Sequence, residues 1–89
     1  MQLNLEIGKL YQVNYNYDLV PTPSWEFTTH ELSLSYHRKN TLIIPLEIQT
    51  ENGNEDKMAI KVLTQNGITG WFLTYKSILH KYLTLVNAQ

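Results

Sequence analysis

The sequence contains no cysteine among its 89 residues. A disulfide framework, a thiolate metal site and a cysteine nucleophile are therefore excluded. Glycine and proline are also scarce, with four and three residues, and the glycines are dispersed along the chain. A phosphate-binding loop needs clustered glycines, so we expect no site of that kind.

Net charge and long apolar runs are lacking too. Seven Lys and Arg stand against eight Asp and Glu, so no overall field attracts the chain to phosphate backbones or anionic lipid. The longest apolar run, Leu42 to Leu46, is far shorter than the ~20 residues that span a bilayer. The first ten residues lack the basic flank and apolar block of a secretory signal. We therefore expect no membrane partner and a cytoplasmic location.

The residues that are present describe an ordinary globular chain. Hydrophobic residues make up 43% and charged residues 17%, and the aromatics comprise two Trp, six Tyr and two Phe. A disordered chain would have fewer aromatics, and a chain this short has room for one core only. We therefore predict a single domain over residues 1–89.

The stretch from Met58 to Leu73 gives the clearest local signal. Apolar and polar residues alternate with a period of two on both sides of Asn66-Gly67, as in two half-buried strands. Asn-Gly favours the positive φ angles of a type I′ turn. The stretch therefore predicts a β-hairpin.

Gly70 lies inside the returning strand of this hairpin. A glycine in a strand marks a bulge or a close approach of another backbone. A bend there would place Trp71 and Phe72 on opposite faces of a curved sheet, and we expect both to be largely buried.

Alternation and turn residues predict the other elements. Pro45 indicates either an edge strand or a bulge, and an edge there would let a second copy cover the apolar run. Self-association is therefore a further expectation. The expected elements are strands at 3–7, 11–17, 41–50 and 82–86, two short strands or an irregular arm over 25–36, loops at 18–24 and 51–56, a basic turn at 37–40 and a helical turn at 74–81.

Together these elements resemble the SH3-like small barrel, an all-β fold. The expected form has five to six short strands, a long arm after the first strand and one short helical turn before the last. The segment Gly67 to Phe72 looks like the turn and strand of bacterial SH3 domains, and Leu10-Tyr11 is similar to their first strand. The short chain is also similar to small proteins of bacteriophage genomes, which would place it in the host cytoplasm.

The resemblance implies a peptide groove lined by aromatic residues. Two departures from the family pattern weaken the grip on a polyproline helix. No tryptophan stands between Asp56 and Ile60, and Leu73 lies near the place of the groove's proline. The groove positions that survive are Tyr11, Tyr15 or Tyr17, and Tyr75.

No constellation points to catalysis or to a cofactor. His30, Glu31 and His37 do not have the spacing of a helical HExxH zinc site. The serines stand in no nucleophile-elbow context. We therefore expect no cofactor, no metal and no enzyme activity, with a hydrolase ranked third among the functions.

The leading hypothesis is a non-catalytic protein–protein interaction or assembly domain. It would bind a partner protein through the aromatic arm over residues 25–36 and through a tyrosine stripe formed by Tyr11, Tyr15 and Tyr17. Trp25 would be an exposed anchor, and Trp71 would lie in the core. The alternative is nucleic-acid binding, with bases stacked on the tyrosines of the stripe beside a basic turn at Arg38 and Lys39. The predicted partner-binding residues are Tyr11, Tyr15, Tyr17, Trp25, Phe27 and Tyr75.

Overall fold

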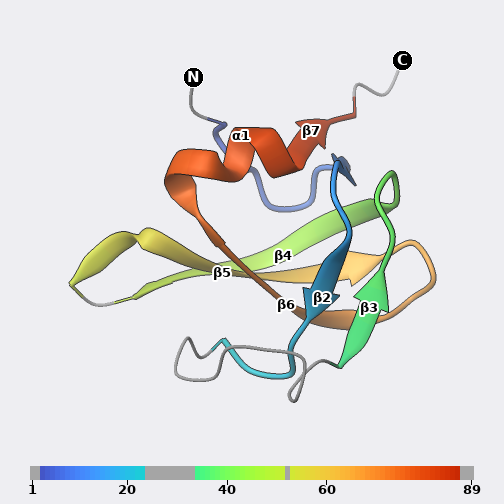
Figure 1. Ribbon diagram of the computed structural model, residues 1–89, viewed down its shortest axis with the longest axis horizontal. Coiled ribbons are helices and arrows are strands. Elements are labelled where there is room, and N and C mark those ends of the chain that lie inside the picture. The colour runs from blue at the N-terminus through green and yellow to red at the C-terminus, as the bar shows by residue number, and fades with distance from the viewer. Residues whose placement is uncertain (1–2, 24–33, 52, 87–89) are drawn as a thin grey trace.

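The structure is a computed structural model that describes residues 3–23, 34–51 and 53–86. Its elements follow the chain in the order of Figure 1. They are β1 (Tyr11–Val13), β2 (Tyr17–Leu19), β3 (Ser35–His37), β4 (Leu42–Glu51), β5 (Asn54–Thr64), β6 (Thr69–Tyr75), the 3-10 helix η2 (Lys76–Ile78), α1 (Leu79–Tyr82) and β7 (Leu83–Leu85).

The described strands form two antiparallel sheets, which confirms the all-β class. One sheet has five strands in the order β6-β5-β4-β1-β7, and the other is a ribbon of β2 and β3. In Figure 1 the ribbon crosses in front of the larger sheet. Within the described ranges no ladder joins the edge strands β6 and β7, so the described strands do not close into a hydrogen-bonded barrel.

The β5–β6 hairpin is confirmed, but its turn differs from the expected type I′. Gly67 has a φ of 83°, whereas Asn66 is not among the residues with positive φ. The amide of Gly67 donates to the carbonyl of Thr64 at 3.0 Å, and the Thr64 amide donates to Ile68 O at 2.8 Å. This is a three-residue loop with glycine in the left-handed position, and the Thr64 hydroxyl closes it by accepting the Ile68 amide at 3.1 Å.

Gly70 marks a close approach and not a bulge. The register of β5 and β6 runs without a break from Lys57–Tyr75 to Leu63–Thr69. A Cβ at Gly70 would lie 2.9 Å from the Cβ of Leu19 in the ribbon. The absent side chain therefore lets β2 pack directly on β6.

Trp71 and Phe72 follow Gly70 and are both buried, as expected, with 9% and 4% of their surfaces exposed. Successive strand residues point to opposite faces. Phe72 belongs to the main core cluster, whereas Trp71 lies outside it. The two aromatics therefore stabilise two different sides of β6.

The prediction that Pro45 marks an edge is wrong, because β4 lies between β1 and β5. The register shifts between Pro45 and Glu47, so the proline sits at a β-bulge, which was the other reading of its position. Its carbonyl accepts the Gly8 amide at 2.9 Å. The apolar run thus has neighbours on both sides at its start, and the basis for self-association through this edge is lost.

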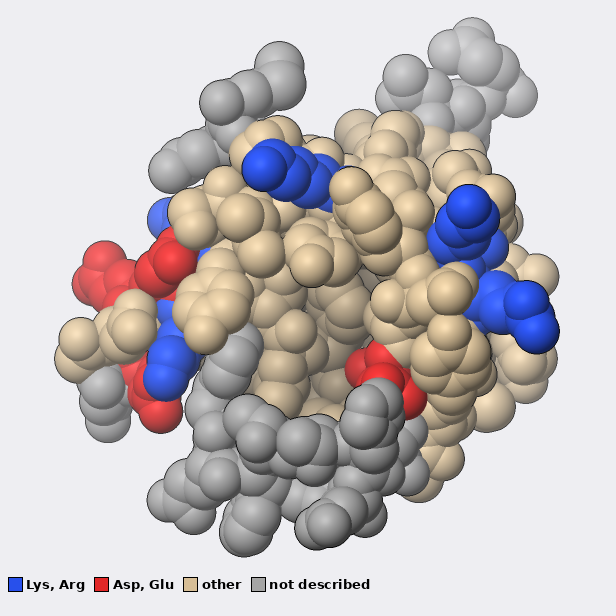
Figure 2. Space-filling view, in the orientation of Figure 1, with Lys and Arg blue, Asp and Glu red and all other residues tan. Residues whose placement is uncertain are grey.

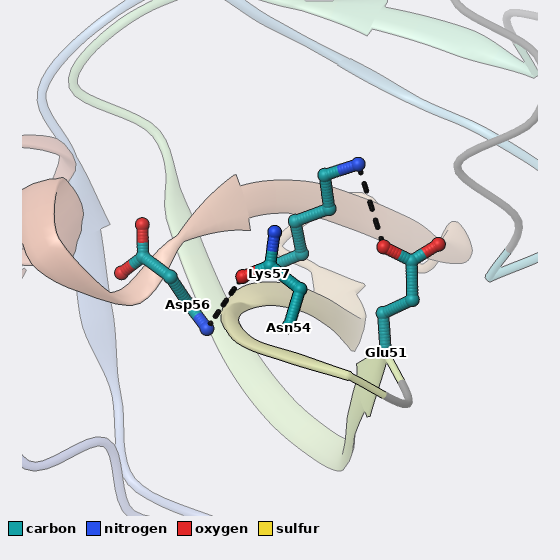
Figure 3. Close-up of polar contacts among 4 residues, drawn as sticks. All are labelled: Glu51, Asn54, Asp56 and Lys57. Atoms are coloured by element: carbon teal, nitrogen blue, oxygen red, sulfur yellow. Dashed lines mark hydrogen bonds and ion pairs between the residues drawn. The ribbon is translucent and has the colours of Figure 1, made fainter.

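The polar loop expected at 51–56 is shorter in the structure, because β5 already begins at Asn54. Figure 3 shows the contacts at this hairpin tip, where Lys57 Nζ lies 3.4 Å from Glu51 Oε2. The Asp56 amide donates to Asn54 Oδ1 at 3.1 Å. The ion pair is half-exposed, so it contributes little stability.

The amino-terminal segment departs most from the prediction, since residues 3–10 form no strand. The expected strand 11–17 is divided into β1 and β2. Asn14 Nδ2 donates to Lys81 O at 3.1 Å and to Thr84 Oγ1 at 2.9 Å. Asn16 Oδ1 accepts the Lys39 amide at 2.9 Å. Asparagine side chains compete with the strand ladder in this way, so the expected strand is interrupted between Val13 and Tyr17.

The helical turn before the last strand is confirmed as η2 and α1. Asp56 in β5 holds its start, because the Ser77 amide donates to Asp56 Oδ1 at 2.9 Å and the Ser77 hydroxyl donates to Oδ2 at 3.1 Å. β7 follows within the span expected for the last strand. The helical segment is thereby fixed to β5 of the larger sheet.

The core lies between the larger sheet, the ribbon and the helix. Partly buried Leu3, Leu5, Ile48, Ile68 and Tyr82 pack against it. Its buried members are Tyr11, Val13, Tyr17, Leu19, Ile43, Met58, Ile60, Val62, Phe72, Leu79 and Leu83.

Candidate partner-binding site

The ribbon and the larger sheet meet at one antiparallel bridge, between Val20 and Trp71. The Val20 amide donates to Trp71 O at 2.9 Å, and the Trp71 amide donates to Val20 O at 2.8 Å. An antiparallel ladder continued from this bridge would pair Asp18 with Leu73, but the described strands make no such pair. The two strands diverge instead.

The diverging strands leave a hollow of about 380 Å³ between them. We call it the β2–β6 groove. Figure 2 shows it near the middle of this face, with mostly uncharged residues around it. Its lining comprises Asn16, Tyr17, Asp18 and Val20 from the ribbon side, residues 72–75 of β6, and Ile78 and Tyr82 from the helical segment.

Tyr17 and Phe72 form the deep part of the groove. Their rings meet edge to face with centroids 5.7 Å apart, and both side chains are buried. The Tyr17 hydroxyl lies 3.0 Å from Thr41 Oγ1. Burial raises the pKa of the Tyr17 phenol, and the hydrogen bond with Thr41 opposes that shift. The phenol therefore stays neutral and acts as a fixed aromatic wall.

His37 in β3 packs against Tyr17 of this wall. Its ring stacks on Tyr17 with centroids 5.1 Å apart, and its Nε2 lies 2.7 Å from Ser35 Oγ. Burial lowers the pKa of His37, and the nearby negative charge of Asp18 partly opposes the shift. A neutral imidazole is favoured at this position, so the stack carries no charge near neutral pH.

The helical end of the groove is closed by two further tyrosines. Tyr82 lines the groove, and its ring centroid lies 4.9 Å from that of Tyr15 at a tilt of 54°. Tyr15 is 52% exposed. The pair therefore offers an aromatic rim that joins the groove to the outer surface.

Charge is distributed unevenly around the groove. Among the described lining residues, Asp18 alone carries a formal charge. The basic turn lies beyond Asn16, whose side chain accepts the Lys39 amide, and both Arg38 and Lys39 are exposed. Figure 2 shows acidic atoms at one rim of the hollow and Lys or Arg side chains farther out. The described lining is thus mostly apolar, with one negatively charged side chain.

The residues predicted from sequence are distributed over several environments. Tyr17 and Tyr75 line the groove, and Tyr15 stands at its rim. Tyr11 has no exposed surface, because β1 lies between β4 and β7, and its hydroxyl accepts the Glu6 amide at 2.9 Å. Trp25 and Phe27 lie outside the described residues. Of the three tyrosines of the stripe, Tyr15 is therefore the exposed one, whereas Tyr11 and Tyr17 belong to the core.

Tyr82, Ile78 and Leu73 line the groove but were not predicted as site residues. A signal for the first two was present, since both share one face of the predicted helical turn with Tyr75. No local pattern marks Leu73, whose place in the groove depends on where the ribbon crosses β6. Its contribution is visible only in the assembled fold.

Other kinds of site find no support within the described ranges. No group of three His, Asp or Glu residues there lies close enough together to hold a metal ion. No helix in the described part of the chain has the length and apolarity needed to cross a membrane. Comparison of the chain with protein-family models, curated proteins and solved structures finds no match.

Proposed function

We propose that the protein is a non-catalytic interaction domain that binds a segment of a partner protein in the β2–β6 groove. The observation that carries this proposal is the groove itself, an apolar hollow with aromatic walls between two diverging strands. Aromatic side chains supply large contact areas at low cost in conformational entropy, and pockets of this size commonly bind ligands.

The SH3-like architecture is part of the same proposal. It is supported by the order of the elements, with the β2–β3 arm after the first strand, the long hairpins β4–β5 and β5–β6, and a 3-10 helix before the last strand. The groove lies between that arm and that helix. The position of Tyr75 at the start of the helical segment agrees with the residue implied by the resemblance.

Selection of peptides from a randomised display library on the immobilised protein tests this proposal. We expect enrichment of related peptides that contain apolar or aromatic residues. Tyr75→Ala should weaken the binding of these peptides about tenfold, which corresponds to about 1.4 kcal/mol. Tyr36→Ala is the matched control, because Tyr36 is 59% exposed on β3 and does not line the groove. Failure to enrich any peptide family, or equal losses in both variants, would contradict the proposal.

Nucleic-acid binding remains the alternative, and one contact favours it. The Asn16–Lys39 hydrogen bond brings the basic turn next to Asn16, which follows the exposed Tyr15 in the chain. A single stacked base on Tyr15 with phosphates on Arg38 and Lys39 would give an affinity that falls steeply with salt. Titration with single-stranded oligonucleotides at low and high salt distinguishes this alternative, because an apolar peptide groove responds weakly to salt.

A further inference from the structure

The backbone of Leu73 faces the groove. Residues in a strand direct their amide and carbonyl groups alternately to the two sides. Trp71 directs both groups to Val20, away from β5, so Leu73, two residues later, directs its groups to the same side. No hydrogen bond joins the Leu73 backbone to another residue of the described ranges. The groove therefore presents one donor and one acceptor at strand spacing.

These two groups lie at a side of β6 that the described strands leave mostly unpaired. β6 pairs with β5 along its whole length, but on its other side it pairs only at Trp71 among the described residues. Unpaired strand edges are templates for another extended chain. Here the edge borders a hollow with aromatic walls, where an inserted chain would partly shield its hydrogen bonds from water.

The charge of the groove selects the chemistry of such a chain. Asp18 borders the hollow opposite Leu73, and it is the charged residue of the described lining. A carboxylate at the edge of an apolar hollow favours a cationic side chain on the bound segment, and an acidic one would be repelled.

From this geometry we propose that the groove binds an extended peptide of a partner protein as an added β-strand. The peptide donates an amide to the Leu73 carbonyl, accepts the Leu73 amide and places a Lys or Arg beside Asp18. This inference rests on the proposed interaction function and specifies its mode of binding. It differs from polyproline recognition, because proline has no amide to donate to the Leu73 carbonyl.

NMR titration of the ¹⁵N-labelled protein with a defined peptide tests the added strand. The probe is acetyl-Thr-Val-Thr-Arg-Thr-Val-Thr-amide at millimolar concentration. We expect a saturable shift of the Leu73 amide signal and slower hydrogen exchange of that amide in the complex. N-methylation of the two peptide amides that flank the arginine should abolish both effects, because it removes the donors that strand pairing requires.

Charge selection is tested with the same peptide carrying Glu in place of Arg. The wild-type protein should bind the Arg peptide at least about fivefold more tightly, a difference of about 1 kcal/mol. Asp18→Asn should reduce that preference to below about twofold. Glu55→Gln, which removes an exposed carboxylate at the tip of the β4–β5 hairpin, should leave it unchanged. The comparison of the Arg and Glu peptides uses the wild-type protein, so its result does not depend on whether a variant folds.

The outcomes separate this inference from the function on which it rests. Library-selected peptides that bind without a response at Leu73, or that tolerate N-methylation at every amide, would overturn the added strand and leave the interaction function standing. Equal affinity for the Arg and Glu peptides would overturn the charge selection. No binding by either the selected peptides or the defined probe would overturn the inference together with the proposed function.

Discussion

The larger sheet and the β2–β3 ribbon are held in place by different forces. β5 pairs with β6 from Lys57–Tyr75 to Leu63–Thr69 without a break. The ribbon is bonded to β6, within the described ranges, at the single bridge of Val20 and Trp71. Otherwise it rests on side-chain packing, with Leu19 against Gly70 and Tyr17 against Phe72.

This difference explains why the groove lies where it does. A continuous ladder leaves no backbone group for a ligand, whereas a ribbon that is bonded to β6 at one bridge exposes the edge of β6 beyond that bridge. Regions with few hydrogen bonds to the rest of a fold also open at lower free energy. We expect the sheet to provide most of the stability and the ribbon to provide the binding surface.

Trp71→Ala tests the point where the two regions join and should have the largest effect. Loss of a buried tryptophan typically costs about 3–5 kcal/mol, against roughly 4–13 kcal/mol for a chain of this size. Thermal unfolding followed by circular dichroism should show a severely lowered Tm or no folded state. Trp25→Ala, outside the described residues, stays predicted to leave stability nearly intact and to weaken partner binding. An exchange of these two behaviours would contradict the assignment of core and surface.

Gly70→Ala tests whether the ribbon depends on close packing. The new Cβ would lie 2.9 Å from Leu19 Cβ, an atom fixed to the backbone, so the ribbon must shift. We expect a loss of about 1–3 kcal/mol in the free energy of unfolding. Hydrogen exchange should also accelerate at the Val20 and Trp71 amides.

The control for this variant is Thr69→Ala, one residue away at an exposed position of β6. It should change the free energy of unfolding by less than about 1 kcal/mol. If Gly70→Ala left the exchange of the Val20 amide unchanged, the ribbon would not depend on this contact.

Asp56→Ala tests a side-chain link between the sheet and the helical wall of the groove. It removes both hydrogen bonds from Ser77 to the carboxylate, and the loss of comparable helix caps costs about 1 kcal/mol. Chemical denaturation should reveal this loss. The neighbouring Glu55→Ala, at an exposed position of the same strand, should stay within about 0.5 kcal/mol of the wild type.

Acidification tests the contribution of His37 in the ribbon and should have the smallest effect on the free energy of unfolding. Burial lowers the pKa of His37 below its ordinary value of 6.5, so the unfolded chain binds this proton more readily than the folded one. At pH values well above 6.5, His37 is neutral in both the folded and the unfolded state, and its contribution to stability does not change with pH. As the pH falls below that value, the unfolded state gains the proton first and stability decreases until the lowered pKa is reached.

His37→Phe keeps the stack on Tyr17 and removes this titration. The free energy of unfolding of the wild type should decrease between about pH 7 and about pH 5 more steeply than that of the variant. Parallel pH profiles for the two proteins would show that His37 does not contribute to the dependence.

The sequence predicted the elements whose evidence is local. Alternation and an Asn-Gly pair identified the β5–β6 hairpin, and a shared apolar face identified the helical turn. Gly70 indicated a bulge or a close backbone approach, and the structure has Leu19 of the ribbon in close contact at Gly70, beside the backbone bridge of Val20 and Trp71. The expected burial of Trp71 and Phe72 is confirmed, although the bend at Gly70 from which it was argued is absent, because the β5–β6 register is continuous.

Tertiary structure alone decided the features that depend on distant partners. Tyr11, Tyr15 and Tyr17 share one parity in the sequence, yet contacts of Asn14 with the last turn and of Asn16 with Lys39 break the strand between them. Two of the tyrosines therefore entered the core and one stayed exposed. Leu73 lines the groove only because the ribbon meets β6 at Trp71 and diverges from there. Hydrogen bonds between residues far apart in the chain, which no local pattern records, fixed both outcomes.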